Sequence, residues 1–168
     1  LNMFQASVKD RAAASQPPLQ KMGAEGQVVV VDNAEKLENL ARRLAGAQAI
    51  SLDTETTSTD QMRADLVGIA LAVDPDQGYY IPLGHIQSDA IQLPKDVVLD
   101  ALRGPLTDPN IRKTGHNLKY DFVVLARAGL RVSPLAFDSM IAEWLTDPGS
   151  RNLGLKNLAW VRLGLQMT

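Results

Sequence analysis

The sequence contains no cysteine, which excludes disulfides, thiolate zinc sites and cysteine nucleophiles. It also lacks a long apolar run, since the stretch Leu66–Val73 has the length of a buried strand and a bilayer span needs roughly 20 residues. Residues 1–20 show no basic start followed by an apolar stretch, so no signal peptide is recognised. These absences lead us to expect a cytoplasmic protein.

A large excess of charge of one sign is also lacking, because 17 basic and 19 acidic residues leave a net charge of only −2. A globally basic surface for nucleic acid is therefore excluded. A protein that holds a single strand end through metal ions and a few local contacts remains compatible with this charge.

The length of 168 residues is typical of one domain with a real core. Residues 1–26 show no hydrophobic period and carry Pro17 and Pro18, which predicts a linker or flexible arm. We expect the folded domain to span residues 27–168.

Hydrophobic periodicity predicts an α/β domain. A three-strand meander is followed by alternating helix and strand, which indicates a mixed sheet flanked by helices. Strands are expected over 28–31, 49–53, 66–73, 78–83 and 111–114. Helices are expected from the cap segment Asp32-Asn33-Ala34-Glu35 to Gly46, and over 94–102, 118–128, 138–145 and 153–163. Trp144 and Trp160 stand among Leu, Ile and Ala in the last two helices, which predicts core packing for both.

Two acids, Asp53 and Glu55, stand two residues apart at the end of a predicted strand, where their side chains point to the same side. Two carboxylates ~4 Å apart repel by about 4 kcal/mol at an effective dielectric near 20. Such a pair needs a proton, a basic partner or a metal, and hard oxygen ligands favour Mg²⁺ or Mn²⁺. The alternative is a pair of solvated acids at a strand end.

A third acid, Asp121, follows in the segment Gly115-His116-Asn117-Leu118-Lys119-Tyr120-Asp121, on a predicted turn from strand to helix. The helix dipole favours an acid in the first turn, so Asp121 could simply stabilise the helix start. The residues alone leave both interpretations open.

Five segments together resemble the 3′→5′ exonuclease domain of bacterial family A DNA polymerases, in order and near the family's spacings. The resemblance covers residues 28–163. The segments are Asp53-Thr54-Glu55-Thr56, Leu66-Val67-Gly68, Tyr80-Ile81-Pro82-Leu83-Gly84-His85, Gly115 to Asp121, and Ala136-Phe137-Asp138-Ser139-Met140.

This resemblance implies a ribonuclease-H-like (DnaQ-like exonuclease) fold and a proofreading enzyme that uses two Mg²⁺ or Mn²⁺ ions. Three carboxylates, Asp53, Glu55 and Asp121, would be both catalytic residues and metal ligands. The expected partner is a single-stranded DNA 3′ end, from which the enzyme would release nucleoside monophosphates. The resemblance also implies a location in the cytoplasm at the bacterial nucleoid. The positions that match substrate contacts of the family are Thr54, Thr56, Asn117, Lys119 and Tyr120.

The family's fourth carboxylate belongs to a Tyr-x-x-x-Asp motif, but the tyrosines of this chain are Tyr79, Tyr80 and Tyr120. We therefore expect a C-terminally incomplete fold, with one metal position weakened, little turnover, and a polymerase domain on the C-terminal side. Thr59 also departs from the family, which has a larger apolar residue there.

The remaining polar residues of interest receive structural interpretations. Asp138 is expected to cap a helix, His85 to be packed or hydrogen-bonded, and His116 to support its loop. Two alternative functions stay open: a non-catalytic module that supports a polymerase domain, and an RNA-trimming exonuclease of the same superfamily.

Overall fold

The computed structural model describes residues 26–86 and 91–167. Apart from Gly26, the predicted linker over residues 1–26 lies outside these residues. None of the helices in the described ranges combines the length and apolar character that a membrane crossing requires.

A six-stranded mixed sheet forms the centre of the protein, with strand order β1-β4-β3-β2-β5-β6. The expected meander is present, since β2–β3 and β3–β4 are antiparallel pairs. The other neighbours, β1–β4, β2–β5 and β5–β6, are parallel. This confirms the predicted mixed sheet. The strands are β1 Gln27–Val30, β2 Ala49–Thr56, β3 Leu66–Ala72, β4 Gln77–Pro82, β5 Arg112–Gly115 and β6 Leu135–Asp138.

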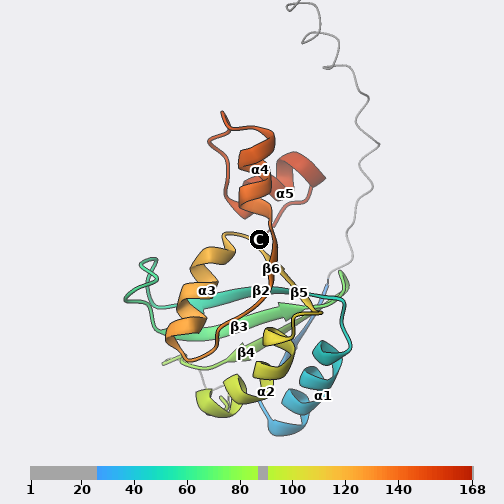
Figure 1. Cartoon of the computed structure of the whole chain (residues 1–168), viewed down its shortest axis with the longest axis vertical. Helices are drawn as coiled ribbons and strands as arrows, with labels where there is room; N and C mark the ends of the chain where they lie inside the picture. The colour runs from blue at the N-terminus through green and yellow to red at the C-terminus, as the bar shows by residue number, and fades with distance from the viewer. Residues whose placement is uncertain (1–25, 87–90, 168) are drawn as a thin grey trace, which may run out of the picture.

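The helices divide into those that pack on the sheet and a pair beyond it. Two of them, α1 and α2, lie side by side under one face of the sheet, and α3 follows β5 (Figure 1). The apolar stripe Leu37, Leu40 and Leu44 joins Ile50 and Leu52 in the core, as the helical spacing predicts. The helices are α1 Ala34–Ala45, α2 Lys95–Thr107, α3 Leu118–Arg127, α4 Ser139–Thr146 and α5 Leu155–Leu163.

Two features of the sheet and its helices differ from the prediction. The strand β6 was not predicted, because its four residues are short and mostly exposed and show no alternation of buried and exposed positions. The helix α2 does not end at Leu102 but continues through Pro105 to Thr107. Proline costs a helix one backbone hydrogen bond, and the burial of Pro105 and Leu106 in the core favours the continuation.

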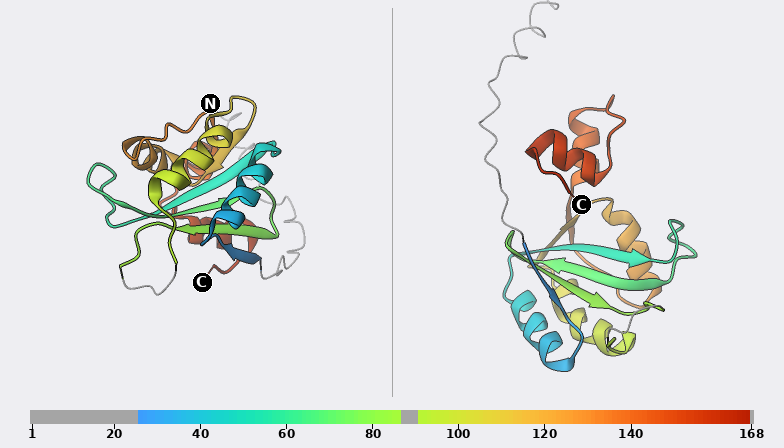
Figure 2. Two further views of the ribbon diagram at one scale, coloured as in Figure 1. Left: turned by 90° about the horizontal axis from the view of Figure 1, so that it is seen from below. Right: turned by 180° about the vertical axis from the view of Figure 1, so that it is seen from behind.

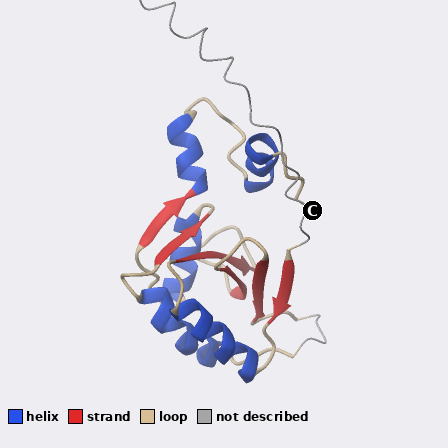
Figure 3. Cartoon of the chain, turned by 90° about the vertical axis from the view of Figure 1, so that its right-hand side faces the viewer, coloured by secondary structure: helices blue, strands red, loops and turns tan. Residues whose placement is uncertain are grey.

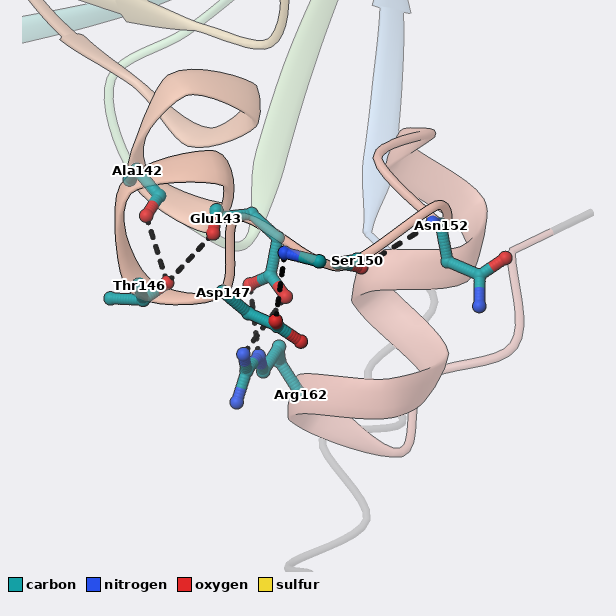
Figure 4. A network of polar contacts seen from close by, with 8 residues as sticks. Ala142, Glu143, Thr146, Asp147, Ser150, Asn152 and Arg162 are labelled. Carbon is teal, nitrogen blue, oxygen red and sulfur yellow. Dashed lines mark hydrogen bonds and ion pairs between the residues drawn. The ribbon is translucent and has the colours of Figure 1, made fainter.

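The last two helices form a lobe of their own, which we call the α4–α5 lobe. It lies on the opposite side of the sheet from α1 and α2 (Figures 2 and 3). A two-pronged ion pair joins its helices: Arg162 Nε donates to Glu143 Oε2 at 3.0 Å and Nη2 donates to Oε1 at 2.8 Å (Figure 4). Glu143 is 9% exposed, so the planar guanidinium supplies the partner that a buried carboxylate requires.

The prediction that both tryptophans pack in the core is wrong. Trp144 is 53% exposed and Trp160 is 61% exposed. The central core cluster contains residues of the sheet and of α1, α2 and α3, while α4 and α5 contribute none. Few side chains of the lobe are therefore buried: Glu143 in α4, and Leu158 and Ala159 in α5.

A single carboxylate, that of Asp138, accepts hydrogen bonds from the backbone N–H groups at the starts of two helices, α3 and α4. Its Oδ1 accepts from Met140 N at 2.9 Å and from Ile141 N at 3.3 Å, which confirms the predicted cap of α4. It also accepts from Asn117 N at 3.0 Å through Oδ1 and from Leu118 N at 2.7 Å through Oδ2. The side chain therefore fixes the first residues of α3 and α4 to one point.

Replacing Asp138 by alanine tests this double role. Loss of one helix cap typically costs ~1 kcal/mol, so we expect Asp138→Ala to lower the free energy of unfolding by about 2 to 3 kcal/mol, because both helix starts lose their acceptor. Asn33→Ala is the matched control, since Asn33 Oδ1 accepts from Lys36 N alone, at the start of α1. Urea unfolding measures both, and equal losses would contradict the double cap.

Candidate active site

The strand β2 presents Asp53 and Glu55 on the face of the sheet away from α1 and α2. Along β2, Ile50, Leu52 and Thr54 are buried while the residues between them are exposed, as the two-residue period of a strand requires. Opposite Asp53 stands Ala70, and opposite Glu55 stands Gly68. Both partners are small, so neither covers the carboxylates with a side chain of its own.

The helix α3 brings Asp121 to the same strand. Asp121 Oδ1 accepts from Thr54 N at 2.8 Å and from Thr54 Oγ1 at 2.7 Å, although the two residues are 67 positions apart in the chain. The residue is only 2% exposed. Asp121 lies in the first turn of α3, as expected, but its carboxylate also joins α3 to β2.

Negative charge accumulates where these segments meet. Desolvation and then the charge of Glu55 raise the pKa of Asp53, while His116 opposes the rise. Burial raises the pKa of Asp121 to about 6, against the hydrogen bonds from Thr54, and the charge of Asp53 contributes to the rise. Asp53 thus interacts with both other acids, and a proton or a cation would relieve the repulsion.

A cavity of about 640 Å³ lies over this point and brings together most of the residues expected from the sequence. Lys119 is the exception, because it lines a separate apolar hollow together with Phe122 and Ile141. Its predicted contact with substrate stays a prediction. The predicted residues that line the cavity are Asp53, Thr54, Glu55, Thr56, Asn117, Tyr120 and Asp121.

One wall of the cavity is held by hydroxyl groups. Thr56 Oγ1, Tyr120 Oη and the carbonyl oxygen of Ser58 lie within hydrogen-bonding distance of one another, with the two hydroxyl oxygens 2.5 Å apart. Because each hydroxyl has one proton, two of these three contacts can be hydrogen bonds at one time. Arg127 Nη1 fixes the rest of this loop, since it donates to Gln61 O at 3.1 Å and to Ala64 O at 2.7 Å. The wall therefore depends on contacts from both ends of α3.

The turn before α3 explains two of the neighbouring side chains. Asn117 has φ 57° and ψ 40°, a left-handed conformation that asparagine tolerates better than most residues. His116 Nδ1 lies 2.9 Å from Ser139 Oγ at the start of α4, so His116 supports its loop as predicted. Its Nε2 is buried and has no hydrogen-bond partner within the described part of the chain.

Further lining residues were missed by the sequence reasoning. Met140 comes from α4, whereas Gly154 and Leu155 come from the start of α5. Nothing in the local pattern of these residues marks them, because the α4–α5 lobe reaches the cavity only through the tertiary fold. Met140 alone belonged to one of the segments that carry the family resemblance.

The later acids of the chain are engaged elsewhere. Asp138 caps two helices, Glu143 pairs with Arg162, and Asp147 Oδ1 accepts from Gly149 N at 3.2 Å. None of the three lines the cavity. The carboxylates of the cavity therefore come from β2 and α3.

The carboxylates of the cavity have the chemistry of a metal site, but their spacing does not match one. Carboxylate oxygens are the ligands that Mg²⁺ and Mn²⁺ prefer. Burial first, and a neighbouring carboxylate second, raise the pKa values of Asp53 and Asp121. Across residues 26–86 and 91–167, however, no three or more His, Asp or Glu side chains are gathered closely enough to hold a metal ion. Asp53 is the acid best placed to share a cation with a neighbour.

Comparison with known proteins decides the family. A family model described as "3'-5' exonuclease" matches residues 28–168. The chain belongs to this 3′-5′ exonuclease family. The chain is 43% identical over 153 residues to the DNA polymerase I of Chloroflexus aurantiacus, an alignment that covers 91% of this chain and 16% of the relative. It is therefore homologous to the exonuclease region of bacterial DNA polymerase I, and it spans about a sixth of that relative's length.

Solved structures of exonucleases share the fold. RNase D of Escherichia coli has a TM-score of 0.64 at 22% identity, over 84% of this chain and 35% of that chain. Brucella melitensis NrnC with bound Mg²⁺ has a TM-score of 0.60 at 24% identity, over 84% of this chain and 62% of that chain. These likenesses confirm the ribonuclease-H-like fold expected from the sequence of this exonuclease domain.

The raised pKa of Asp121 predicts how stability depends on pH. Its pKa rises from 3.8 to about 6 on folding, so the folded state holds this proton more tightly between those values. The resulting stabilisation is complete below pH ~4 and is lost as the pH rises through ~6. At ~1.4 kcal/mol per pKa unit, we expect the free energy of unfolding to fall by about 2 to 3 kcal/mol over this range.

Asp121→Asn isolates this effect, because an amide oxygen can still accept from Thr54 while the charge is gone. Urea unfolding at several pH values should show that the variant lacks this part of the pH dependence. Glu38→Gln, at an exposed position of α1, should keep the wild-type pH profile. A wild-type profile for Asp121→Asn would contradict the assignment.

Proposed function

We propose that this chain is a 3′→5′ DNA exonuclease of the proofreading kind, which hydrolyses the 3′-terminal phosphodiester with the help of Mg²⁺ or Mn²⁺. The observation that carries the proposal is the meeting of Asp53 and Glu55 from β2 with Asp121 from α3 in one cavity. The pKa values of Asp53 and Asp121 support it, because burial and a neighbouring carboxylate raise both, and perturbed carboxyl groups cluster at functional sites. Family membership gives this arrangement its chemical context.

In this proposal Asp53, Glu55 and Asp121 hold the cations. The bound ions would activate a water and offset the charge that develops on the leaving oxygen. Thr54 keeps Asp121 oriented through its two hydrogen bonds. The released product is a nucleoside monophosphate.

The opposite wall suits a single-stranded 3′ end. Thr56 and Tyr120 offer a hydroxyl pair, and Tyr120 adds an aromatic ring on which a base can stack without sequence preference. Asn117 lines the same cavity, and Lys119 on α3 supplies positive charge nearby for the phosphate backbone. These residues would hold the strand while the acids face its terminal phosphate.

DNA is favoured over RNA as the substrate. The relative at 43% identity is a DNA polymerase I, whereas the likeness to RNase D stands at 22% identity and concerns the fold. In a DNA polymerase I the natural partner of this domain would be a polymerase domain on its C-terminal side, which delivers mispaired ends. We propose the same partnership for this chain.

Turnover by the 168 residues alone is proposed to be slow. The cavity contains three carboxylates, and the sequence has no Tyr-x-x-x-Asp motif to supply a fourth. A second candidate function follows from the same geometry: a non-catalytic module that supports a polymerase domain. It is favoured by the observation that, among the described residues, no group of three acidic or histidine side chains is placed closely enough to hold a metal ion, although three acids line the same cavity.

A manganese titration with three proteins separates these functions. We expect wild type to bind Mn²⁺ and Asp53→Ala to bind it at least about tenfold more weakly, because Asp53 interacts with both other acids. Glu38→Gln removes one exposed carboxylate from α1 and should bind as wild type does. Electron paramagnetic resonance of free Mn²⁺ gives the affinities, and equal binding by wild type and Asp53→Ala would remove the proposed site.

The reaction is followed with 5′-labelled single-stranded DNA and with RNA of the same sequence. Slow loss of mononucleotides from the 3′ end, faster on DNA and abolished by a blocked 3′ terminus, is the expected result. Metal binding with no hydrolysis at all would favour the supporting module. Rapid multiple turnover would contradict the slow reaction proposed for these 168 residues.

A further inference from the structure

Beyond the cavity, the open face of the sheet continues from β2 across β3 to β4. Ala70 pairs with Asp53 on one side and with Tyr80 on the other. Side chains of directly opposed residues point to the same face. Tyr80 therefore shares the open face with Asp53 and Glu55.

The ring of Tyr80 extends over Gly68. A Cβ placed on Gly68 would lie 2.2 Å from Tyr80 Oη and 2.6 Å from its Cζ, so only glycine leaves room for the phenol. Gly68 is also the direct partner of Glu55 in the sheet. The hydroxyl thus lies above the residue that pairs with Glu55, and burial followed by the charge of Glu55 raises the pKa of Tyr80.

A second residue, His85, holds the hydroxyl in place. Its Nε2 lies 2.5 Å from Tyr80 Oη. The side chain of Gln92 in turn clamps the His85 backbone: His85 N donates to Gln92 Oε1 at 2.8 Å, and Gln92 Nε2 donates to His85 O at 2.9 Å. When His85 Nε2–H donates to Tyr80, the phenol proton is free to point towards Glu55.

Two acids of the cavity, Asp121 and Glu55, differ in the hydrogen bonds that their carboxylates receive. Asp121 is fixed by Thr54, whereas no side-chain hydrogen bond to the Glu55 carboxylate is found in the described part of the chain. Fixing a glutamate costs rotamer entropy, and ligating carboxylates are ordinarily oriented by hydrogen bonds from residues behind them. Glu55 lacks such a partner unless the Tyr80 hydroxyl provides it.

We propose that Tyr80 is a positioning residue for Glu55, and that His85 and Gln92 hold its hydroxyl for this purpose. The inference rests on the proposed function, in which Glu55 is a metal ligand that the Tyr80 hydroxyl would orient. It also explains why a tyrosine, a histidine and a glutamine form a hydrogen-bonded chain beside the cavity without lining it.

The test compares Tyr80→Phe with Tyr79→Phe. Each variant removes one phenol hydroxyl, but Tyr79 is 9% exposed in the core on the other face, where its hydroxyl donates to Gln77 Oε1 at 2.7 Å. We expect Tyr80→Phe to weaken Mn²⁺ binding about tenfold, the lower end of the usual effect of losing an orienting partner. Tyr79→Phe should bind Mn²⁺ as wild type does.

A metal-free readout makes the positioning role independent of activity. The carboxyl carbon resonance of Glu55, identified by its loss in Glu55→Gln, should move in Tyr80→Phe and stay in Tyr79→Phe. Gly68→Ala provides a second variant, because it keeps the hydroxyl but displaces the ring; it should also move the resonance and weaken Mn²⁺ binding.

The outcomes separate this inference from the proposed function. If Asp53→Ala weakens Mn²⁺ binding but Tyr80→Phe leaves both the affinity and the Glu55 resonance unchanged, the positioning role is overturned while the metal site stands. If Asp53→Ala has no effect on Mn²⁺ binding, the proposed function fails. The Glu55 resonance then decides the role of Tyr80 alone, and an unmoved signal in Tyr80→Phe overturns it.

Discussion

The contact between the Asp121 carboxylate and Thr54 joins the two segments from which the cavity is built. Burying a carboxylate at 2% exposure is unfavourable, and the two hydrogen bonds from Thr54 offset only part of that cost, as the pKa of about 6 shows. The position of α3 against β2 follows from this contact. Asn117 and Tyr120 begin the same helix and are therefore carried to the cavity with it.

The two faces of the sheet differ in what they carry. One face is covered by α1 and α2 and contains the apolar core. The fully buried Lys113 donates from its ammonium to the carbonyl oxygens of Asp108 and Ile111. The other face carries Asp53 and Glu55, whose partners in the sheet, Ala70 and Gly68, are small. Most of the core therefore lies on one side of these strands, and Asp53 and Glu55 lie on the other.

Much of this arrangement was predictable from the sequence because it depends on local patterns. The spacing of Asp53 and Glu55 predicts a shared face, and the turn before α3 predicts an acid in its first turn. Features that depend on tertiary packing were not predictable. The exposure of Trp144 follows from a lobe that stands apart from the core, and the nearness of Tyr80 to Glu55 requires the register of two strand pairs.

The double cap at Asp138 has a mechanical consequence. Because one carboxylate ties the first residues of both α3 and α4, it fixes the start of the α4–α5 lobe to the start of α3. Met140 and Leu155 belong to that lobe and line the cavity, whereas Asp53 and Asp121 belong to the sheet and α3. The part of the cavity lining that Met140 and Leu155 form is therefore linked to the part that Asp121 and Tyr120 form through this one carboxylate.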